Sequence, residues 1–277
     1  LRAYYNISSS TGSNLSTQAV VLPFTGETND FSPNGLKLFL EAFQSFPLDL
    51  FSRPERIPST KGNETQCRYF PSTCREGNLD VQYIMATSPG SPTTFWYTDA
   101  GFAGWLVDVA NTTDVPLVLS ISFGRQEKTT SKSELDAFNT QAIKLGVMGV
   151  TIVVSTGDDG ANSRGPRGGN IDKCGYIAKF PASSPYVTAV GATQGPELTA
   201  SGVFDGSEIT CSSSTGALIT SGGGFSNYYM RANTASFQST AVDNYLKNVT
   251  GTNRAPAAGF NTGGRAYPDI GISLSYL

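Results

Sequence analysis

The stretch Thr151-Ile152-Val153-Val154-Ser155 decides the fold class, because it is an almost wholly apolar run. It lacks the alternation of polar and apolar residues that a strand with one solvated face shows. We therefore predict a strand that is covered on both faces, as in a parallel sheet. Residues 133 to about 146, directly before it, have helical spacing, with inward side chains at Leu135, Phe138, Ala142 and Leu145.

Working outward, the same patterns recur along the chain. Strands are predicted at residues 18–24, 117–122 and 187–190, and helices at about 76–86 and 99–111. Another helix is predicted to begin near Asp30-Phe31-Ser32-Pro33, with a face formed by Leu36, Phe39, Leu40 and Phe43. Residues 47–73, rich in Pro, Arg, Thr and Gly, are predicted to be irregular surface.

Strands that alternate with helices of this length indicate βαβ units. We predict an α/β fold, with a doubly wound, mostly parallel sheet and helices on both faces. The length of 277 residues suits one large domain or two small ones, and length alone does not choose between them. Ligands in such sheets bind beyond the carboxyl ends of the strands, where Ser122–Gly124 and Ser155–Asp158 are predicted to lie.

Composition excludes some classes of partner. The net charge of −3 gives no basic footprint, so we do not expect nucleic acid binding. The longest uncharged stretches are broken by Gly, Ser and Pro, and none is predicted to span a membrane. Charged residues make up only 15% of the chain, which would limit self-repulsion at acid pH. A Ser-, Thr- and Gly-rich surface with no relation to pH explains this composition equally well.

Four cysteines and five glycosylation sequons favour a secretory route. The cysteines allow three disulfide pairings. We predict Cys67–Cys74 and Cys174–Cys211, because each closes a loop within one region. The sequons are Asn6, Asn14, Asn63, Asn111 and Asn248. No signal peptide opens the chain, so we expect a processed form that is secreted or lies in a lysosomal or acidic vacuolar compartment.

The chain contains no histidine, which excludes Ser-His-Asp and Cys-His catalysis by its own residues. Acid–base chemistry must therefore come from carboxyl groups, Tyr or Lys. Glu76 and Asp80 lie four residues apart near the start of a predicted helix, so both carboxyl groups share one face. Two such groups, when partly buried, tend to share a proton. Taken on spacing alone, two acids that favour a helix N-terminus are the commoner explanation.

Two loops are further candidates for a functional site. Asp158 directly follows an apolar strand in Ser155-Thr-Gly-Asp-Asp-Gly, which in isolation is an ordinary Asp-Gly turn. The segment Ser221-Gly-Gly-Gly-Phe-Ser would let a backbone approach a ligand closely, or would simply be a flexible loop. It matches no phosphate-binding fingerprint.

Taken together, ordered motifs along nearly the whole chain resemble the sedolisin (serine-carboxyl peptidase) family, in its tripeptidyl-peptidase-like branch. Residues 1–8 resemble a mature N-terminus left after propeptide removal. The other matching motifs, in family order, are Glu76-x-x-x-Asp80-Val-Gln-Tyr, Ser122-Phe-Gly, Ser155-Thr-Gly-Asp-Asp-Gly, Phe180-Pro-Ala-Ser-Ser-Pro, Ser221-Gly-Gly-Gly-Phe-Ser and Arg265-Ala-Tyr-Pro-Asp-Ile.

The resemblance implies a subtilisin-like fold and a Ser-Glu-Asp triad. Glu76 would be the general base toward the serine, Asp80 would support Glu76, and Asp158, as a protonated acid, would donate to the oxyanion. The substrate backbone would lie in extended form along Ser122, Gly124, Ser221, Gly222 and Gly223. At pH ~4 a histidine base would be protonated about 300 to 1, whereas a glutamate with a pKa of about 4.3 is poised there. An acid optimum follows from the residue types as well.

The resemblance also shows what this sequence does not contain. The family's serine lies in Ser-Gly-Thr-Ser-Ala-Ser, which occurs nowhere here, and neither Ser273 nor Ser275 has those flanking residues. The family's calcium ligands are likewise expected outside this chain, so calcium is implied but no metal ligand is named. Residues 1–277 would be one peptidase domain that lacks its C-terminal portion. The chain would be the larger piece of a two-chain enzyme, a fragment, or a non-catalytic relative, and the first two are favoured.

Arg125 is a second departure, because tripeptidyl members of the family carry an acidic residue there. We therefore predict an acid endopeptidase that hydrolyses peptide or protein substrates, with its serine on a separate or missing segment, such as a companion chain. The alternative is a non-catalytic glycoprotein that binds peptide or glycan. A carboxylate-pair glycosidase uses the same acids but explains neither the glycine-rich segment nor the Asp158 turn.

Overall fold

A computed structural model describes residues 4–7, 15–22, 30–43, 55–57, 62–162, 175–195, 197–198, 204–252 and 258–273. The chain divides into two compact units. Unit 1 comprises Leu1–Phe123 with Thr140–Val153, and unit 2 comprises Gly124–Asn139 with Val154–Leu277. Each unit is described by itself. The organisation of residues 1–277 as one peptidase domain stays a prediction.

The sheet of unit 1 contains four parallel strands. They are β1 (Gln18–Leu22), β2 (Glu55–Ile57), β3 (Thr93–Tyr97) and β4 (Val118–Ile121). They pair in the order β2-β3-β1-β4. Every residue of β1 is buried, which is expected of a central strand between two layers of helices. The predicted strands at 18–24 and 117–122 are confirmed, although residues 23–24 lie outside the described part.

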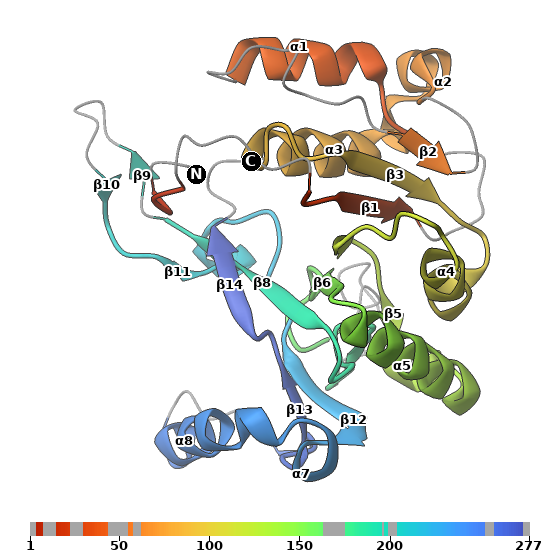
Figure 1. Cartoon of the computed structure of the whole chain (residues 1–277). Helices are drawn as coiled ribbons and strands as arrows, with labels where there is room; N and C mark the ends of the chain where they lie inside the picture. Colours follow the sequence, from red (N-terminus) through yellow and green to blue (C-terminus); the bar gives the residue numbers. More distant parts are fainter. Residues whose placement is uncertain are drawn as a thin grey trace. The chain divides into compact units, whose positions relative to one another are not determined.

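Helices cover both faces of this sheet. They are α1 (Pro33–Phe43), α3 (Arg75–Thr87) and α4 (Gly101–Ala110). Adjacent residues of a strand point to opposite faces. Phe95 of β3 packs with Val81 of α3 in one buried cluster, while Trp96 meets Trp105 of α4 at 6.3 Å between ring centroids. The unit is therefore wound on both sides, and α1 and α3 lie side by side on one of them (Figure 1).

The prediction of irregular surface over residues 47–73 is wrong where the structure describes this stretch. It contains β2, α2 (Glu64–Tyr69) and the 3-10 helix η2 (Pro71–Thr73). A cap begins α2, since the side chain of Asn63 accepts a hydrogen bond from the Gln66 amide. Six residues are too few to show an apolar repeat, so periodicity could not reveal this helix.

The chain passes between the units in α5 (Lys132–Val147) and β6 (Thr151–Ser155), each of which contains residues of both. The predicted helix and strand are confirmed. All four predicted inward side chains of the helix are buried. In β6, Ile152 and Val154 on one face are buried, but on the other face Val153 is half-buried and Thr151 and Ser155 are exposed, so the prediction of a strand covered on both faces is wrong.

In unit 2, β8 (Thr188–Gln194) pairs in parallel with β14 (Ile270–Ser273) and antiparallel with β11 (Ile209–Thr210). The strand predicted at 187–190 is thus confirmed and is longer. Antiparallel pairs join β12 (Gly224–Met230) to β13 (Gly264–Tyr267), β5 (Arg125–Gln126) to β7 (Lys179–Phe180), and β9 (Glu197–Leu198) to β10 (Phe204–Asp205).

The helical segments of unit 2 are short apart from α8. They are η3 (Glu127–Thr129), η5 (Ser213–Thr215), α7 (Arg231–Thr234), η6 (Ser236–Gln238) and α8 (Ser239–Val249). Across the part of the chain that is described, no helix has the length and apolar character needed to cross a bilayer.

Candidate functional site

Glu76 and Asp80 lie on α3 of unit 1, and Asp80 is held by a serine from the end of β4. The Ser122 hydroxyl donates a hydrogen bond of 2.8 Å to Asp80 Oδ1. Burial raises the pKa of Asp80 to about 7, the charge of Glu76 adds to this effect, and the Ser122 hydrogen bond opposes it. This shift favours the protonated form of Asp80 at pH ~4.

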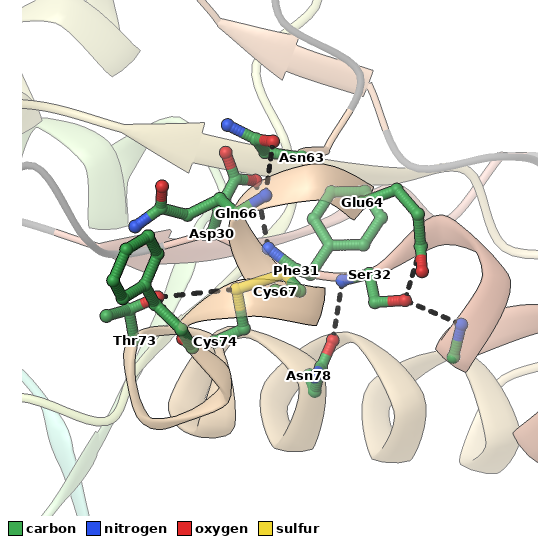
Figure 2. Close-up of a disulfide and its surroundings, with 12 residues drawn as sticks. Asp30, Phe31, Ser32, Asn63, Glu64, Gln66, Cys67, Thr73, Cys74 and Asn78 are labelled. Carbon is green, nitrogen blue, oxygen red and sulfur yellow. Dashed lines mark hydrogen bonds between the residues drawn. A yellow bond between two sulfur atoms is a disulfide. The ribbon is translucent and has the colours of Figure 1, made fainter.

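The start of α3 is fixed by a close backbone approach. A Cβ atom at Gly77 would lie 2.2 Å from the Asp30 carbonyl oxygen, so only glycine fits. The neighbouring Asn78 Oδ1 accepts a 2.7 Å hydrogen bond from the Ser32 amide, and the Ser32 hydroxyl donates to Glu64 at 2.6 Å (Figure 2). These contacts hold the turn that carries Glu76 against the segment before α1.

A disulfide adds a covalent restraint at the same place. Cys67 of α2 is bonded to Cys74, which is the N-cap residue of α3, two positions before Glu76 (Figure 2). This predicted pairing is confirmed. The predicted Cys174–Cys211 bond is wrong, because Cys211 is a buried free thiol. Cys174 lies outside the described residues, so no geometry explains the difference.

Asp158 lies in unit 2, in the turn that follows β6. Its side chain is exposed, and its charge together with burial raises the pKa of the nearby Cys211 thiol. The turn needs a left-handed residue, and Gly157 supplies it with φ +90°. The Thr156 amide donates to the Val190 carbonyl at 3.1 Å, which joins the start of the turn to β8.

The predicted substrate-binding segment of unit 2 uses its own amides internally. The amides of Ser221, Gly222 and Gly223 donate to the carbonyl groups of Cys211, Gly157 and Gly160, at 2.9, 2.7 and 3.3 Å respectively. The three amides are therefore paired within unit 2, and binding of an extended substrate backbone along Ser221, Gly222 and Gly223 stays a prediction. Gly124, by contrast, is exposed beside the Phe180 carbonyl.

A pocket of about 640 Å³ lies beside the same segment, within unit 2. Ser221 and Gly223 form part of its wall, and six of the other lining residues are aromatic: Tyr176, Phe225, Phe237, Tyr245, Phe260 and Tyr267. Ser221 and Asp269, which contribute polar atoms, already hold hydrogen bonds within the protein. The pocket therefore suits an apolar or aromatic group.

Two buried charge clusters of unit 2 were not foreseen. The fully buried Arg265 pairs with Asp269 at 2.6 Å, and Asp269 also accepts from Gln238 at 2.7 Å and from the Ala189 amide at 2.8 Å. The motif Arg265-Ala-Tyr-Pro-Asp269 contained the only sequence signal, two opposite charges four residues apart.

The second cluster is centred on the buried Glu127. Its carboxylate accepts from the Ser226 hydroxyl at 2.6 Å and from the Asn227 and Tyr228 amides at 2.8 and 3.1 Å. These contacts tie η3 to the start of β12. The partners lie about a hundred residues away, so no local pattern indicated them.

Arg125 is ion-paired with Glu134 of α5, so its charge is compensated within the unit. Four sequon asparagines, Asn6, Asn63, Asn111 and Asn248, are exposed, and Asn14 lies outside the described residues. Glycosylation stays a prediction. The described residues bring together no group of three or more acidic or cysteine side chains that could hold a metal ion, so we derive no step through calcium.

The chain is similar in sequence to known proteins. No protein-family model matches the chain. Tripeptidyl-peptidase 1 of Homo sapiens is 34% identical over 203 residues, which cover 70% of this chain and 32% of the relative. Tripeptidyl-peptidase 1 of Dictyostelium discoideum is 32% identical over 251 residues, covering 87% and 35%. The chain thus spans about a third of the length of these relatives.

A solved structure shows the fold. Pseudomonas sedolisin, a serine-carboxyl proteinase complexed with two molecules of pseudo-iodotyrostatin, matches 96% of this chain and 67% of its own, with 23% identity and a TM-score of 0.61. The predicted subtilisin-like α/β fold with a mostly parallel sheet is therefore confirmed.

Proposed function

We propose that this chain, which belongs to the sedolisin family, forms the main part of an acid serine-carboxyl peptidase. The catalytic serine would come from a segment outside residues 1–277, either a companion chain or a C-terminal portion. Its Oγ attacks the peptide carbonyl while Glu76 accepts the hydroxyl proton, which Glu76 then delivers to the leaving amine. Asp158, as a carboxylic acid, would donate a hydrogen bond to the oxyanion.

The observation that carries this proposal is that Asp80, four residues after Glu76 on α3, accepts a 2.8 Å hydrogen bond from the Ser122 hydroxyl. Burial raises the pKa of Asp80 to about 7 and the charge of Glu76 adds to this effect, which favours the protonated form of Asp80 at pH ~4. A single carboxylate beside a neutral acid can act as a base, whereas two charged neighbours would repel each other. The Ser122 hydrogen bond holds Asp80 in place for this role.

We propose endopeptidase action on extended peptides. Tripeptidyl members of the family carry an acidic residue where this chain has Arg125. Arg125 forms an ion pair with Glu134, so the two charges compensate each other. A free substrate amino terminus would find no uncompensated carboxylate in this pair. The aromatic pocket would accept an apolar side chain of the substrate.

The test requires a serine-complete preparation and a long peptide with a blocked amino terminus, digested at pH ~4. Internal cleavage is expected, and Glu76→Gln should lower kcat by about 100-fold or more. Asp114→Asn, at an exposed site, is the matched control and should cleave normally. Release of tripeptides from unblocked chains alone would refute the endopeptidase proposal. Peptide binding without any hydrolysis would favour the non-catalytic alternative.

The proposed function also implies a cellular compartment for the protein and a companion chain that binds it. The Cys67–Cys74 disulfide supports an oxidising secretory route, so we propose a secreted, lysosomal or acidic vacuolar protein. Denaturing mass spectrometry of the purified protein would reveal a companion chain that carries Gly-Thr-Ser. Recovery of residues 1–277 as an active single chain would refute the companion.

A further inference from the structure

The segment from Thr220 to Gly223 runs along the Asp158 turn and is hydrogen-bonded to it on both sides. The Thr220 amide donates to the Asp158 carbonyl at 2.9 Å, and the Gly160 amide donates to the Thr220 carbonyl at 3.0 Å. Asp159 and Thr220 form a parallel β-bridge. With the bonds from the Gly222 and Gly223 amides, the turn from Gly157 to Gly160 is held at four points.

Glycine at position 222 is required by this contact. A Cβ atom there would lie 1.9 Å from the Thr156 carbonyl oxygen and 2.8 Å from that of Gly157. Both are backbone atoms, which cannot rotate aside as a side chain would. At Gly223 the nearest atom would be the Tyr267 carbonyl oxygen at 3.4 Å, an ordinary contact. The two adjacent glycines therefore differ sharply in how closely the turn approaches them.

Ser221 anchors the segment on its other side. Its hydroxyl oxygen accepts a 2.8 Å hydrogen bond from the Ala192 amide of β8, and its own amide donates to the Cys211 carbonyl at 2.9 Å. A Cβ at Gly191 would lie 2.9 Å from this hydroxyl oxygen, so β8 also meets Ser221 through a glycine. The segment thus joins the sheet to the Asp158 turn.

We propose that Ser221 and Gly222 are positioning residues for Asp158, and that they act on hydrolysis through this turn instead of through the substrate backbone. The inference rests on the proposed function, in which Asp158 donates to the oxyanion. A donor in the oxyanion site works only when it is held at hydrogen-bond distance from the developing charge. Four bonds to one rigid segment, itself fixed to β8, supply that restraint.

The experiment uses the serine-complete protein, a blocked chromogenic peptide and the variants Gly222→Ala, Gly223→Ala and Ser221→Ala. Gly222→Ala should lower kcat by about 100-fold, the effect of misplacing a catalytic group by about 1 Å, with KM nearly unchanged. Gly223→Ala should lower it much less. Gly146→Ala, where an added Cβ meets nothing within 4 Å, is the control and should match the wild type.

A double-mutant cycle separates positioning from an independent role. Asp158→Ala should lower kcat by about 100- to 1000-fold, and adding Ser221→Ala should produce no further loss, because Ser221 acts only through Asp158. A KM increase at constant kcat for Ser221→Ala, or additive losses in the double variant, would overturn the proposal and favour direct substrate binding.

Amide hydrogen exchange distinguishes failure of this inference from failure of the proposed function. Exchange at Gly160 and Thr220 should accelerate about tenfold or more in Ser221→Ala, since both amides form hydrogen bonds between the Asp158 turn and the Thr220–Gly223 segment. Unchanged exchange overturns the inference, whatever the activity. Full activity of Asp158→Ala refutes the oxyanion role in the proposed function. Faster exchange in Ser221→Ala would still establish that Ser221 holds the Thr220–Gly223 segment against the Asp158 turn. The exchange measurement uses Ser221→Ala, so it can still be interpreted if Gly222→Ala fails to fold.

Discussion

Replacement of Asp80 by Asn should remove a pH dependence of stability that this one carboxyl group imposes. Burial and the Glu76 charge raise the pKa of Asp80 from 3.8 to about 7. Between these two pH values the folded state holds a proton that the unfolded state has released, so the free energy of unfolding falls as pH rises. It levels off above pH ~7, where both states are ionised.

The magnitude follows from the two pKa values. At 1.36 kcal/mol per pKa unit, the full difference corresponds to about 4 kcal/mol lost between pH ~4 and pH ~7. The Asp80 side chain keeps some contact with solvent, which screens part of this effect, so we expect a loss of about 2 to 4 kcal/mol. Asparagine has the same shape and does not titrate, so the Asp80→Asn variant should lose this component.

The assay is urea unfolding at pH values from 3 to 8, followed by tryptophan fluorescence. The only two tryptophans of the chain, Trp96 and Trp105, are buried against each other in unit 1, the unit that contains Asp80. The difference between wild type and Asp80→Asn isolates one carboxyl group from the others. Asp114→Asn, at an exposed site, should reproduce the wild-type curve. A difference curve that is flat from pH 4 to 7, or that rises with pH, would refute the reasoning.

Three further changes have expected outcomes. Ser122→Ala removes the hydroxyl that donates to Asp80, so the pKa of Asp80 should rise further. In a plot of the free energy of unfolding against pH, the fall should then extend to a pH about one unit higher; an unchanged plot would contradict this. Cys67→Ser with Cys74→Ser opens a short loop and should lower the free energy of unfolding by about 2.5 kcal/mol, measured in urea against the oxidised wild type. Asp269→Ala leaves its fully buried arginine partner uncompensated and should lower it by about 3 to 5 kcal/mol, whereas Asp269→Asn, which keeps an acceptor, should lower it less.

Elements with a long apolar repeat were predictable from the sequence. In α5 the inward residues recur over about three turns, and all of them are buried. In α2 only six residues are helical, and the helix depends on the Asn63 cap and on the bond from Cys67 to Cys74. A capping side chain and a disulfide are not part of an apolar repeat, so apolar periodicity along the sequence does not report them.

The candidate site divides in the same way. Glu76, Asp80 and Asp158 occur in short ordered motifs, which made them visible. Glu127 has no such motif, because its partners at Ser226 and beyond are brought to it only by folding. The sequence predicted that the backbone of the glycine-rich segment approaches a ligand, but it could not show what the amides of this segment bind within the protein. Hydrogen bonds within unit 2 use those amides instead.

Each unit brings the backbone that carries a candidate carboxyl group close to another backbone segment through a glycine. At Gly77 the helix that carries Glu76 approaches a backbone carbonyl, and at Gly222 a loop approaches the turn that carries Asp158. In both places an added Cβ would lie 2.2 Å or less from a carbonyl oxygen. Backbone hydrogen bonds do not titrate between pH 3 and 8, unlike side-chain ion pairs. The main-chain contacts at Gly77 and Gly222 are therefore unaffected when carboxyl groups of the site change charge, whereas the side-chain contacts of Glu64 and Asp80 involve groups that titrate.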